Sequence, residues 1–365
     1  MLLKEKIAQM LMIGFDGTTL HADDAVVRAI LAQQLGGVIL FDYNFQTKVY
    51  DRNIKNPQQL KQLNEQLQDY AKQAAIKNKK DFIPLFIGVD YEGGKVNRLK
   101  ERYGFPMAPS AAEMGLCSAE QVKKFAEQMA DVLSEAQINL NFAPALDVNV
   151  NPVSPVIGKL GRSYSADPKK VVECAAVFSK AYQQQGIIAA YKHFPGHGSA
   201  IGDTHHGFVD VTATWQAQEL YPYQQLLPHA NDMMVMVAHV VHHGLDSHGY
   251  PASLSAEIIQ GLLRDQLHFN GVVVTDDMQM KAITDHYGLA EAMRLAINAG
   301  VDLLVFGNQL VLTPQDPGEM IELIYQEVMR GLIAESRIEE AWQRIKKLKE
   351  KIRKKCVHVS HFENN

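Results

Sequence analysis

The 365-residue sequence contains few cysteines, no long apolar run and no excess of positive charge. Its three cysteines, Cys117, Cys174 and Cys356, are far apart and odd in number, which argues against a disulfide framework and a zinc site. No apolar run reaches the roughly 18 residues of a membrane-spanning helix. With 36 Lys and Arg against 41 Asp and Glu, the chain lacks the positive surface that nucleic-acid binding needs. We therefore expect neither a membrane nor a nucleic acid as partner.

The N-terminal segment MLLKEKIAQMLMIGF carries charged side chains at residues 4–6. Charges at this point interrupt the apolar stretch that a secretory signal peptide needs, so we interpret the segment as a short amphipathic helix leading into a strand. A native start at Met1 then predicts a cytoplasmic protein, whereas removal of an upstream signal would leave the same sequence.

Short apolar runs, many of them ending in a polar or charged residue, recur along the whole chain. They predict strands at residues 10–15, 36–42, 84–90, 139–148, 186–194, 232–240, 271–277 and 299–307. The runs are nearly continuous in hydrophobicity, as parallel strands buried on both faces are. Helical segments lie between most of them, and this alternation predicts an α/β fold, a single-domain (β/α)8 TIM-type barrel. An open doubly wound sheet is the alternative, but no Gly-rich fingerprint follows the first strand.

Helical periodicity is clearest after the second, third and fourth runs, over residues 56–74, 118–136 and 167–185. Ser118 and Asp167 stand where an N-cap side chain is favoured. Two further helices are expected at 316–334 and 336–355, so the barrel domain spans 1–355 and residues 356–365 form a flexible tail. Residues 43–56 are polar and long for a strand-to-helix loop, which suggests a rim over the site.

Histidine is concentrated in one part of the chain. Of the 14 histidines, those between residues 193 and 268 are His193, His197, His205, His206, His229, His239, His242, His243, His248 and His268. A metal site would explain the cluster, but Pro195 and nearby glycines exclude a helix that would put His193 and His197 on one face. The adjacent pairs at 205–206 and 242–243 have diverging side chains, and no HExxH motif occurs. We therefore expect no metal and no other cofactor.

The active sites of such barrels lie at the C-terminal ends of the strands. Predicted strands end there in Asp90 with Glu92 just after it, Asp147, Lys192 with His193, His239, and Asp276 with Asp277. Single charges at strand ends are often simply solvated, but a barrel without a site has no need to gather so many on one face. The loop that follows residue 194 contains Gly196, Gly198 and Gly202, which allow it to move and to approach a ligand.

Four motifs within this framework resemble those of glycoside hydrolase family 3, in particular its single-domain β-N-acetylglucosaminidases. They are VDYEGGKVNR at 89–98, GRSY at 161–164, KHFPGHG at 192–198 with DTH at 203–205, and VTDDMQM at 274–280. The resemblance implies a retaining mechanism with a covalent glycosyl–enzyme, formed on a carboxylate that is ionised at neutral pH. It makes Asp276 the nucleophile, although the residues alone do not favour it over Asp277, since neighbours on a strand face opposite ways.

The resemblance also implies an acid/base that is not a second carboxylic acid. It assigns this role to His205, because a histidine with a pKa near neutrality can protonate the leaving oxygen and then activate water. Asp203 would orient the ring and favour its charged form. The ordinary alternative is that Asp203 caps a turn and His205 is a solvated loop residue.

For the sugar itself, the resemblance implies acceptors and donors around the ring of a terminal N-acetylglucosamine. The acceptor would be Asp90, and the donors would be Arg98, Arg162, Lys192 and His193. We also expect His239, at the end of its strand, to line the site. In the ordinary alternatives, Arg98 is a surface cation and Arg162 pairs with Asp167.

We therefore expect a cytoplasmic, exo-acting β-N-acetylglucosaminidase, favoured as a monomer. By the resemblance, its substrate is a small carbohydrate or muropeptide with a terminal N-acetylglucosamine, as cell-wall recycling supplies. The sequence departs from the family pattern at Tyr91, Lys95 and 199–200, which affects fine specificity more than activity. The alternatives are a phosphorylase of the same fold, a β-glucosidase, and, in another class, a metal-dependent barrel hydrolase or a sugar-binding module without turnover.

Overall fold

The computed structural model describes residues 1–45, 47–230 and 232–362, with side chains described as far as residue 352. Eight parallel strands close into a barrel in the order β1-β14-β13-β11-β9-β8-β5-β2, so each strand pairs with its neighbours along the chain. They are β1 Leu11–Gly14, β2 Gly37–Leu40, β5 Phe86–Val89, β8 Leu140–Asn141, β9 Ile188–Phe194, β11 Met234–Val237, β13 Val272–Asp277 and β14 Leu303–Phe306. All lie within the predicted ranges, so the (β/α)8 barrel is confirmed and the open sheet is excluded.

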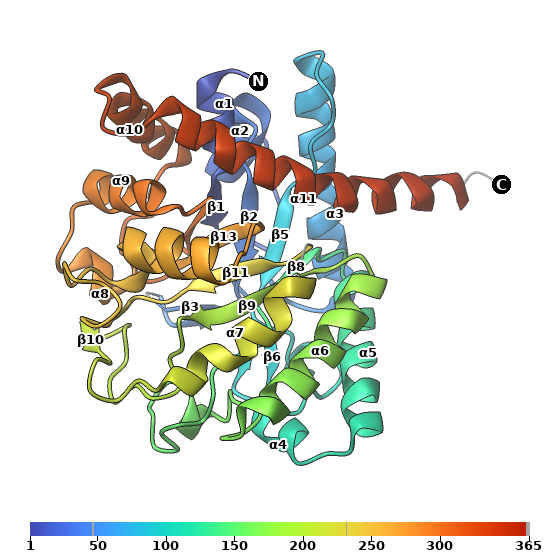
Figure 1. The fold of residues 1–365 in the computed structure, drawn as a ribbon. Helices are drawn as coiled ribbons and strands as arrows, with labels where there is room; N and C mark the ends of the chain where they lie inside the picture. The colour runs from blue at the N-terminus through green and yellow to red at the C-terminus, as the bar shows by residue number, and fades with distance from the viewer. Residues whose placement is uncertain (46, 231, 363–365) are drawn as a thin grey trace.

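Helices surround the barrel and lie between its strands (Figure 1). The α-helices are α1 Leu3–Gln9, α2 Ala25–Gln33, α3 Pro57–Lys77, α4 Ala111–Gly115, α5 Ala119–Glu135, α6 Pro168–Gln184, α7 Tyr221–Leu226, α8 Lys281–Thr284, α9 Leu289–Ala299, α10 Pro317–Met329 and α11 Glu335–Phe362. Further helical segments are η1 Glu101–Tyr103, η2 Gly158–Leu160, η3 Ala217–Leu220, η4 Leu227–His229, η5 Ala252–Leu254 and η6 Glu257–Gln266. Ser118 caps α5 by accepting from the Gln121 N–H, and Asp167 caps α6 by accepting from the Lys169 N–H, as predicted.

The last helix closes the N-terminal end of the barrel. From α11, which crosses the molecule in Figure 1, the buried Lys349 donates to Gln9 Oε1 at 2.7 Å and to the Gly36 carbonyl at 2.6 Å. Both acceptors lie just before barrel strands, so α11 is fixed beneath β1 and β2. This helix continues to Phe362, past the predicted end at 355, and residues 363–365 lie outside the described part of the chain. The flexibility of the tail stays a prediction.

Small two-stranded sheets extend from the C-terminal end of the barrel. The segment 43–56 forms the antiparallel hairpin β3 Tyr43–Asn44 and β4 Val49–Tyr50, where a loop was expected. A second hairpin joins β6 Tyr91–Gly93 to β7 Val96–Asn97, and β10 Val209–Asp210 pairs in parallel with β12 Val240–Val241. These additions lie on the face where active sites of this architecture occur.

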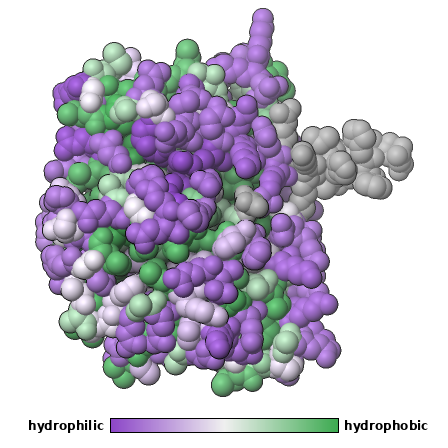
Figure 2. All heavy atoms as spheres, in the orientation of Figure 1, coloured by the Kyte–Doolittle hydropathy of each residue, from purple (hydrophilic) through white to green (hydrophobic). Residues whose placement is uncertain are grey.

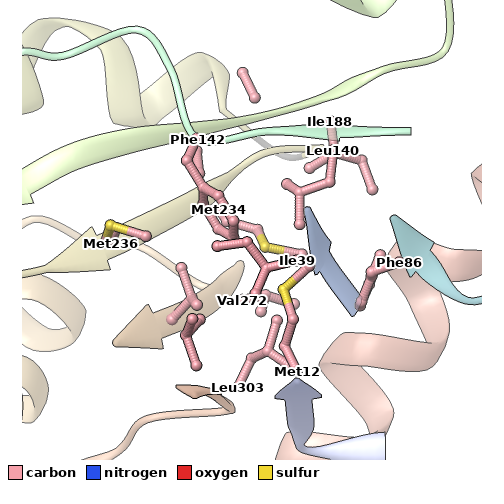
Figure 3. Close-up of a cluster of buried hydrophobic side chains, with 14 of the residues drawn as sticks. Met12, Ile39, Phe86, Leu140, Phe142, Ile188, Met234, Met236, Val272 and Leu303 are labelled. Atoms are coloured by element: carbon pink, nitrogen blue, oxygen red, sulfur yellow. The ribbon is translucent and has the colours of Figure 1, made fainter. Parts of the chain in front are cut away.

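Apolar side chains fill the barrel interior, and every barrel strand or the residues next to it contribute (Figure 3). The labelled residues Met12, Ile39, Phe86, Leu140, Phe142, Ile188, Met234, Met236, Val272 and Leu303 are all buried. Each such side chain stabilises the fold by about 1.5–3 kcal/mol through the area it removes from water. Because the interior is filled, polar groups at the strand ends lie at the mouth of the barrel rather than in a channel through it.

The outer surface in Figure 2 is mostly hydrophilic, with apolar residues in scattered patches on the face shown. Such a distribution is ordinary for a globular surface, where single exposed apolar residues need no partner. Among the described residues, no helix is both long and apolar enough to cross a membrane.

Candidate active site

A cavity of about 180 Å³ opens at the C-terminal ends of the barrel strands. It brings together eight of the nine predicted site residues: Asp90, Arg98, Arg162, Lys192, His193, Asp203, His205 and Asp276. Apolar side chains complete the wall, among them Phe41 just after β2, Met236 of β11 and Val305 of β14. The volume is below the several hundred Å³ of a typical drug-sized pocket, so it suits one small polar ring.

A larger hollow of about 650 Å³ lies at the opposite end of the barrel, beside Trp342 and Lys349. The titratable groups in its lining are lysines together with Asp81 and Glu350. These residues include no histidine or cysteine to serve as a base or an activated nucleophile. We therefore place the chemistry in the smaller cavity.

A network of paired charges forms one wall of the small cavity. Lys192 Nζ, at the end of β9, contacts Asp90 Oδ1 at 2.9 Å and Glu92 Oε1 at 2.6 Å. Arg162 donates two hydrogen bonds to Glu92, from Nε at 2.9 Å and from Nη2 at 2.7 Å. Burial would lower the pKa of Lys192, but the carboxylates of Asp90 and Glu92 outweigh it and raise that pKa. The wall therefore presents fixed, charged donors and acceptors at neutral pH.

Arg98 belongs to the same wall rather than to the outer surface. Its guanidinium lies 3.5 Å from Asp90 Oδ2 and 3.8 Å from Asp42 Oδ1, and the side chain is 20% exposed. Asp42 is fully buried at the end of β2 and also pairs with Lys100. The β3–β4 hairpin begins at the next residue, so its base adjoins the cavity. The function of this rim stays a prediction.

His193 lies in this wall with both ring nitrogens engaged. Nδ1 lies 2.6 Å from the buried Asp147 Oδ2, and Arg162 Nη2 lies 3.0 Å from Nε2. An arginine can only donate, so Nε2 accepts the Arg162 N–H and Nδ1 carries the proton that is donated to Asp147. As the ring lies, His193 lines the cavity and supports Arg162, and its role as a donor to the sugar stays a prediction.

Asp276 and Asp277 end β13 in contrasting surroundings. Burial would raise the pKa of Asp276, but the rings of His193, His239 and His205 and the Asp277 N–H outweigh it and hold that pKa well below its usual value. Burial, with a smaller contribution from the charge of Asp276, raises the pKa of Asp277 to about 6. One oxygen of Asp277 also accepts the Gln279 and Gly307 N–H groups. The structure thus distinguishes the two: Asp276 is the ionised carboxylate, and Asp277 is tied to the backbone.

The loop after β9 carries a histidine–aspartate pair over the same cavity. Asp203 Oδ1 accepts from the His205 backbone N–H and from ring Nδ1, each at 2.9 Å. Burial lowers the pKa of His205, but the Asp203 hydrogen bond and the charges of Asp276 and Asp203 outweigh it and raise that pKa. Burial would raise the pKa of Asp203, but the hydrogen bonds from His205 outweigh it and lower that pKa to about 2. The half-exposed ring is thus oriented and poised to carry a proton near neutral pH.

His239 does not line the cavity, which corrects the prediction for this residue. It is 1% exposed, with Nδ1 at 2.6 Å from Ser253 Oγ and Nε2 at 3.0 Å from the Asp277 carbonyl. Burial lowers its pKa. Since both nitrogens are used inside the fold, His239 fixes the end of β13 beneath Asp276 instead of touching a ligand.

Sequence reasoning assigned no role to several residues that build the site. Glu92 and Asp147 stand at predicted strand ends, so their positions were visible, but their pairing with Arg162 and His193 was not. Asp167 caps α6 rather than pairing with Arg162, which excludes the ordinary alternative for that arginine. Glu219 lies far along the chain and in no motif, so nothing local indicated it. Among the described residues, no group of three or more His, Cys, Asp or Glu side chains could hold a metal ion.

Comparison with known proteins places this geometry in a family. The glycosyl hydrolase family 3 N-terminal domain matches residues 2–348. The chain belongs to glycoside hydrolase family 3. It is 36% identical over 308 residues to a beta-hexosaminidase of Tolumonas auensis, covering 82% of each chain. It is 33% identical over 307 residues to a beta-hexosaminidase of Haemophilus influenzae, covering 82% of this chain and 79% of that one.

Solved structures of the family have the same fold. A beta-N-acetylhexosaminidase from Beutenbergia cavernae superimposes with a TM-score of 0.82 at 27% identity, covering 96% of this chain and 99% of the other. A family 3 beta-N-acetylglucosaminidase from Paenibacillus reaches 0.85 at 34% identity, covering 96% of this chain. This family 3 chain spans 62% of the Paenibacillus chain and 45% of beta-hexosaminidase A from Pseudoalteromonas piscicida.

Proposed function

We propose that this family 3 glycoside hydrolase is a retaining exo-β-N-acetylglucosaminidase that removes terminal β-linked N-acetylglucosamine. The observation that carries the proposal is the pairing of an ionised Asp276 with the oriented His205–Asp203 pair across one ring-sized cavity. The names of the relatives support the choice of N-acetylglucosamine as the sugar.

In the first step, Asp276 attacks the anomeric carbon and forms a glycosyl ester, while the glycosidic bond breaks. His205, protonated on the nitrogen not bound to Asp203, gives its proton to the departing oxygen. The low pKa of Asp276 keeps this carboxylate charged and nucleophilic, and it also stabilises an oxocarbenium-like transition state. A histidine that is neutral after this transfer adds no second negative charge beside Asp276.

In the second step, neutral His205 takes a proton from water, and the water oxygen attacks the same carbon. The ester breaks, Asp276 recovers its charge, and the sugar leaves with its original anomeric configuration. Asp203 accepts the Nδ1 proton throughout, so the ring keeps one tautomer and one orientation while the other nitrogen cycles. The reaction needs no cofactor.

The charged wall would bind the hydroxyls of the sugar. Asp90 offers carboxylate oxygens, while Lys192, Arg98 and Arg162 offer N–H groups, so hydroxyls can be satisfied as donors and as acceptors. Within this arrangement, His193 acts through Arg162.

We propose a muropeptide or another small carbohydrate with a terminal N-acetylglucosamine as substrate. The free thiols of Cys117 and Cys174 suit a reducing compartment, as the expected cytoplasmic setting would be.

One set of assays separates this function from its alternatives. Matched aryl β-N-acetylglucosaminide and aryl β-glucoside substrates are compared with and without phosphate and a chelator, and products are followed by NMR. We expect faster release of N-acetylglucosamine, first as the β-anomer, with rates insensitive to both additives. A sugar 1-phosphate product would make the protein a phosphorylase, faster glucoside cleavage would make it a glucosidase, and loss of activity with chelator would indicate metal-dependent chemistry. A muropeptide disaccharide compared with N,N′-diacetylchitobiose then tests the proposed aglycone.

A further inference from the structure

Glu219 is a buried carboxylate outside the cavity lining that the mechanism above does not use. It lies in η3 and is fully buried. Its Oε2 accepts the backbone N–H of Gly198 at 2.9 Å and of Ser199 at 3.3 Å, and its Oε1 accepts the Gln216 N–H at 3.2 Å. One carboxylate thus links η3 to the backbone at the start of the loop that carries His205.

The start of this loop is packed so closely that its glycines are required. Gly196 has a φ of +125°, and a Cβ built on it would lie 2.6 Å from Glu219 Cβ. A Cβ on Gly198 would lie 1.7 Å from the Val148 carbonyl oxygen. On the other side, Asp147 Oδ1 accepts the His197 N–H at 2.8 Å. The segment 196–199 is therefore fixed between two buried carboxylates, Glu219 and Asp147.

The rest of the loop has fewer such anchors. Ile201 is 71% exposed, and the His205 side chain is half-exposed. Between the two residues of the catalytic pair, the Thr204 carbonyl accepts the Ala282 N–H at the start of α8 at 3.2 Å. Asp203 and His205 thus lie on a short stretch whose start is held by Glu219 and whose middle is held by α8. A shift of its start would change the position of the ring relative to Asp276.

We propose that Glu219 is a positioning residue for the acid/base pair, because it fixes the Gly198–Ser199 backbone from which Asp203 and His205 extend. The inference rests on the proposed function of His205. Glu219 itself does not contact the substrate in this proposal. Misplacement of a catalytic group by about 1 Å can cost on the order of 100-fold in rate, so a remote anchor of this kind affects catalysis strongly.

The ionisation of Glu219 bears on how firmly it holds the loop. Burial raises the pKa of Glu219 to about 7, and the nearby negative charge of Asp147 adds to this effect. Another titratable group facing it is Tyr223 of α7, whose own pKa is raised by burial and which stays neutral. A neutral carboxyl is a weaker acceptor than a carboxylate, so protonation of Glu219 weakens its bonds to the three N–H groups.

The test compares Glu219→Gln with Glu327→Gln, using kcat/KM for two substrates. The first substitution keeps the side-chain shape but turns an NH2 group toward backbone N–H donors, whereas Glu327 is a buried carboxylate of α10, paired with Arg294 and Arg330, outside the cavity lining. For Glu219→Gln we expect a fall of about tenfold or more with N,N′-diacetylchitobiose, which needs the acid, and less than about threefold with the 2,4-dinitrophenyl glycoside. For Glu327→Gln we expect the same small change with both substrates.

An equal loss on both substrates, or none on either, would overturn the positioning role. The variant His205→Ala is measured in parallel. If its loss of kcat/KM does not depend on the leaving group, His205 is not the acid and the proposed function itself fails. If the loss depends on the leaving group in His205→Ala but not in Glu219→Gln, only the present inference is refuted. Should Glu219→Gln not fold, hydrogen exchange of residues 196–206 in the unaltered protein provides the test. We expect intrinsic-rate-corrected protection of Gly198 and Ser199 to fall between pH 8 and pH 6, and unchanged protection would contradict the proposal.

Discussion

Both ends of the barrel bury clusters of oppositely charged side chains, but the central carboxylate of each cluster has a different number of hydrogen-bond partners. At the N-terminal end, Asp302 precedes β14 and both of its oxygens are occupied. Oδ2 accepts Arg264 Nη2 at 2.8 Å and the Val273 N–H at 3.0 Å, while Oδ1 accepts Arg344 Nη1 at 3.1 Å and an Arg337 N–H. At the C-terminal end, Asp276 accepts the Asp277 N–H at 2.8 Å, the one hydrogen bond to its carboxylate within the described part of the chain.

This difference separates a carboxylate that stabilises from one that reacts. Asp302 joins β14 to arginines of η6 and α11, so its charge is neutralised by the fold and it has no lone pair to offer. Asp276 is kept ionised while one side of it faces a cavity. An ionised group left short of partners in a buried place costs stability, and such places in a native protein are typically functional. The predictions below test this contrast, beginning with the largest expected effect.

Asp276→Ala should reduce turnover by on the order of 10⁴-fold or more, because the covalent step loses its nucleophile. The melting temperature should stay the same or rise, since only one hydrogen bond is lost and a buried charge is removed. Steady-state kinetics with an aryl N-acetylglucosaminide and a thermal melt provide both measurements. Azide with an activated substrate is the control: it should restore cleavage and give the α-configured glycosyl azide. A near-normal rate in the variant would refute the assignment of Asp276.

Asp302→Asn should have the opposite effects, a loss of stability without a loss of catalysis. Removing the charge leaves three arginines around a buried site without their counter-ion, which should lower the free energy of unfolding by roughly 3 kcal/mol or more. For the folded fraction, kcat/KM should be unchanged. Urea unfolding gives the stability, and Glu120→Gln, at an exposed pair with Lys124, is the matched control with an expected change below about 1 kcal/mol. A stable Asp302→Asn variant with impaired catalysis would reverse the comparison between the two ends.

His205→Ala should reduce kcat/KM by roughly 100-fold for substrates with poor leaving groups. Activated aryl glycosides should be much less affected, because their leaving groups need no proton. A plot of log kcat/KM against the leaving-group pKa should therefore become steeper in the variant than in the unaltered enzyme. Parallel plots for the two proteins would show that His205 is not the acid.

The sequence predicted those parts of the molecule that depend on local pattern. Eight apolar runs indicated the barrel, and the residues that end them, such as Asp90, Lys192 and Asp276, meet because the C-terminal ends of parallel strands share one face. The residues alone did not favour Asp276 over Asp277, and the family resemblance made that choice. The structure adds that the backbone N–H groups of residues 279 and 307 reach Asp277.

The sequence did not predict the hydrogen bonds between distant segments. His239 stands at a strand end like the residues that line the cavity, but Ser253 and the Asp277 carbonyl occupy its two nitrogens. His193 faces the cavity, yet Asp147 and Arg162 already use its ring. No periodicity in the sequence specifies these pairings, because they follow from how separate loops fold back over the barrel. For the same reason Glu219 could not be recognised before the loop it holds was placed.

Asp203→Asn should give the smallest effect, a shift of the pH profile rather than a loss of activity. Asp203 raises the pKa of His205 through its hydrogen bond and its charge, so removing that charge should lower this pKa. The first step needs protonated His205; therefore the alkaline limb of kcat/KM should move toward acid pH, by about one unit or less. The acid limb reflects protonation of Asp276, whose charge the substitution leaves in place, so this limb should not move. A shift toward alkaline pH, or an equal movement of both limbs, would mean that Asp203 does not control the protonation of His205.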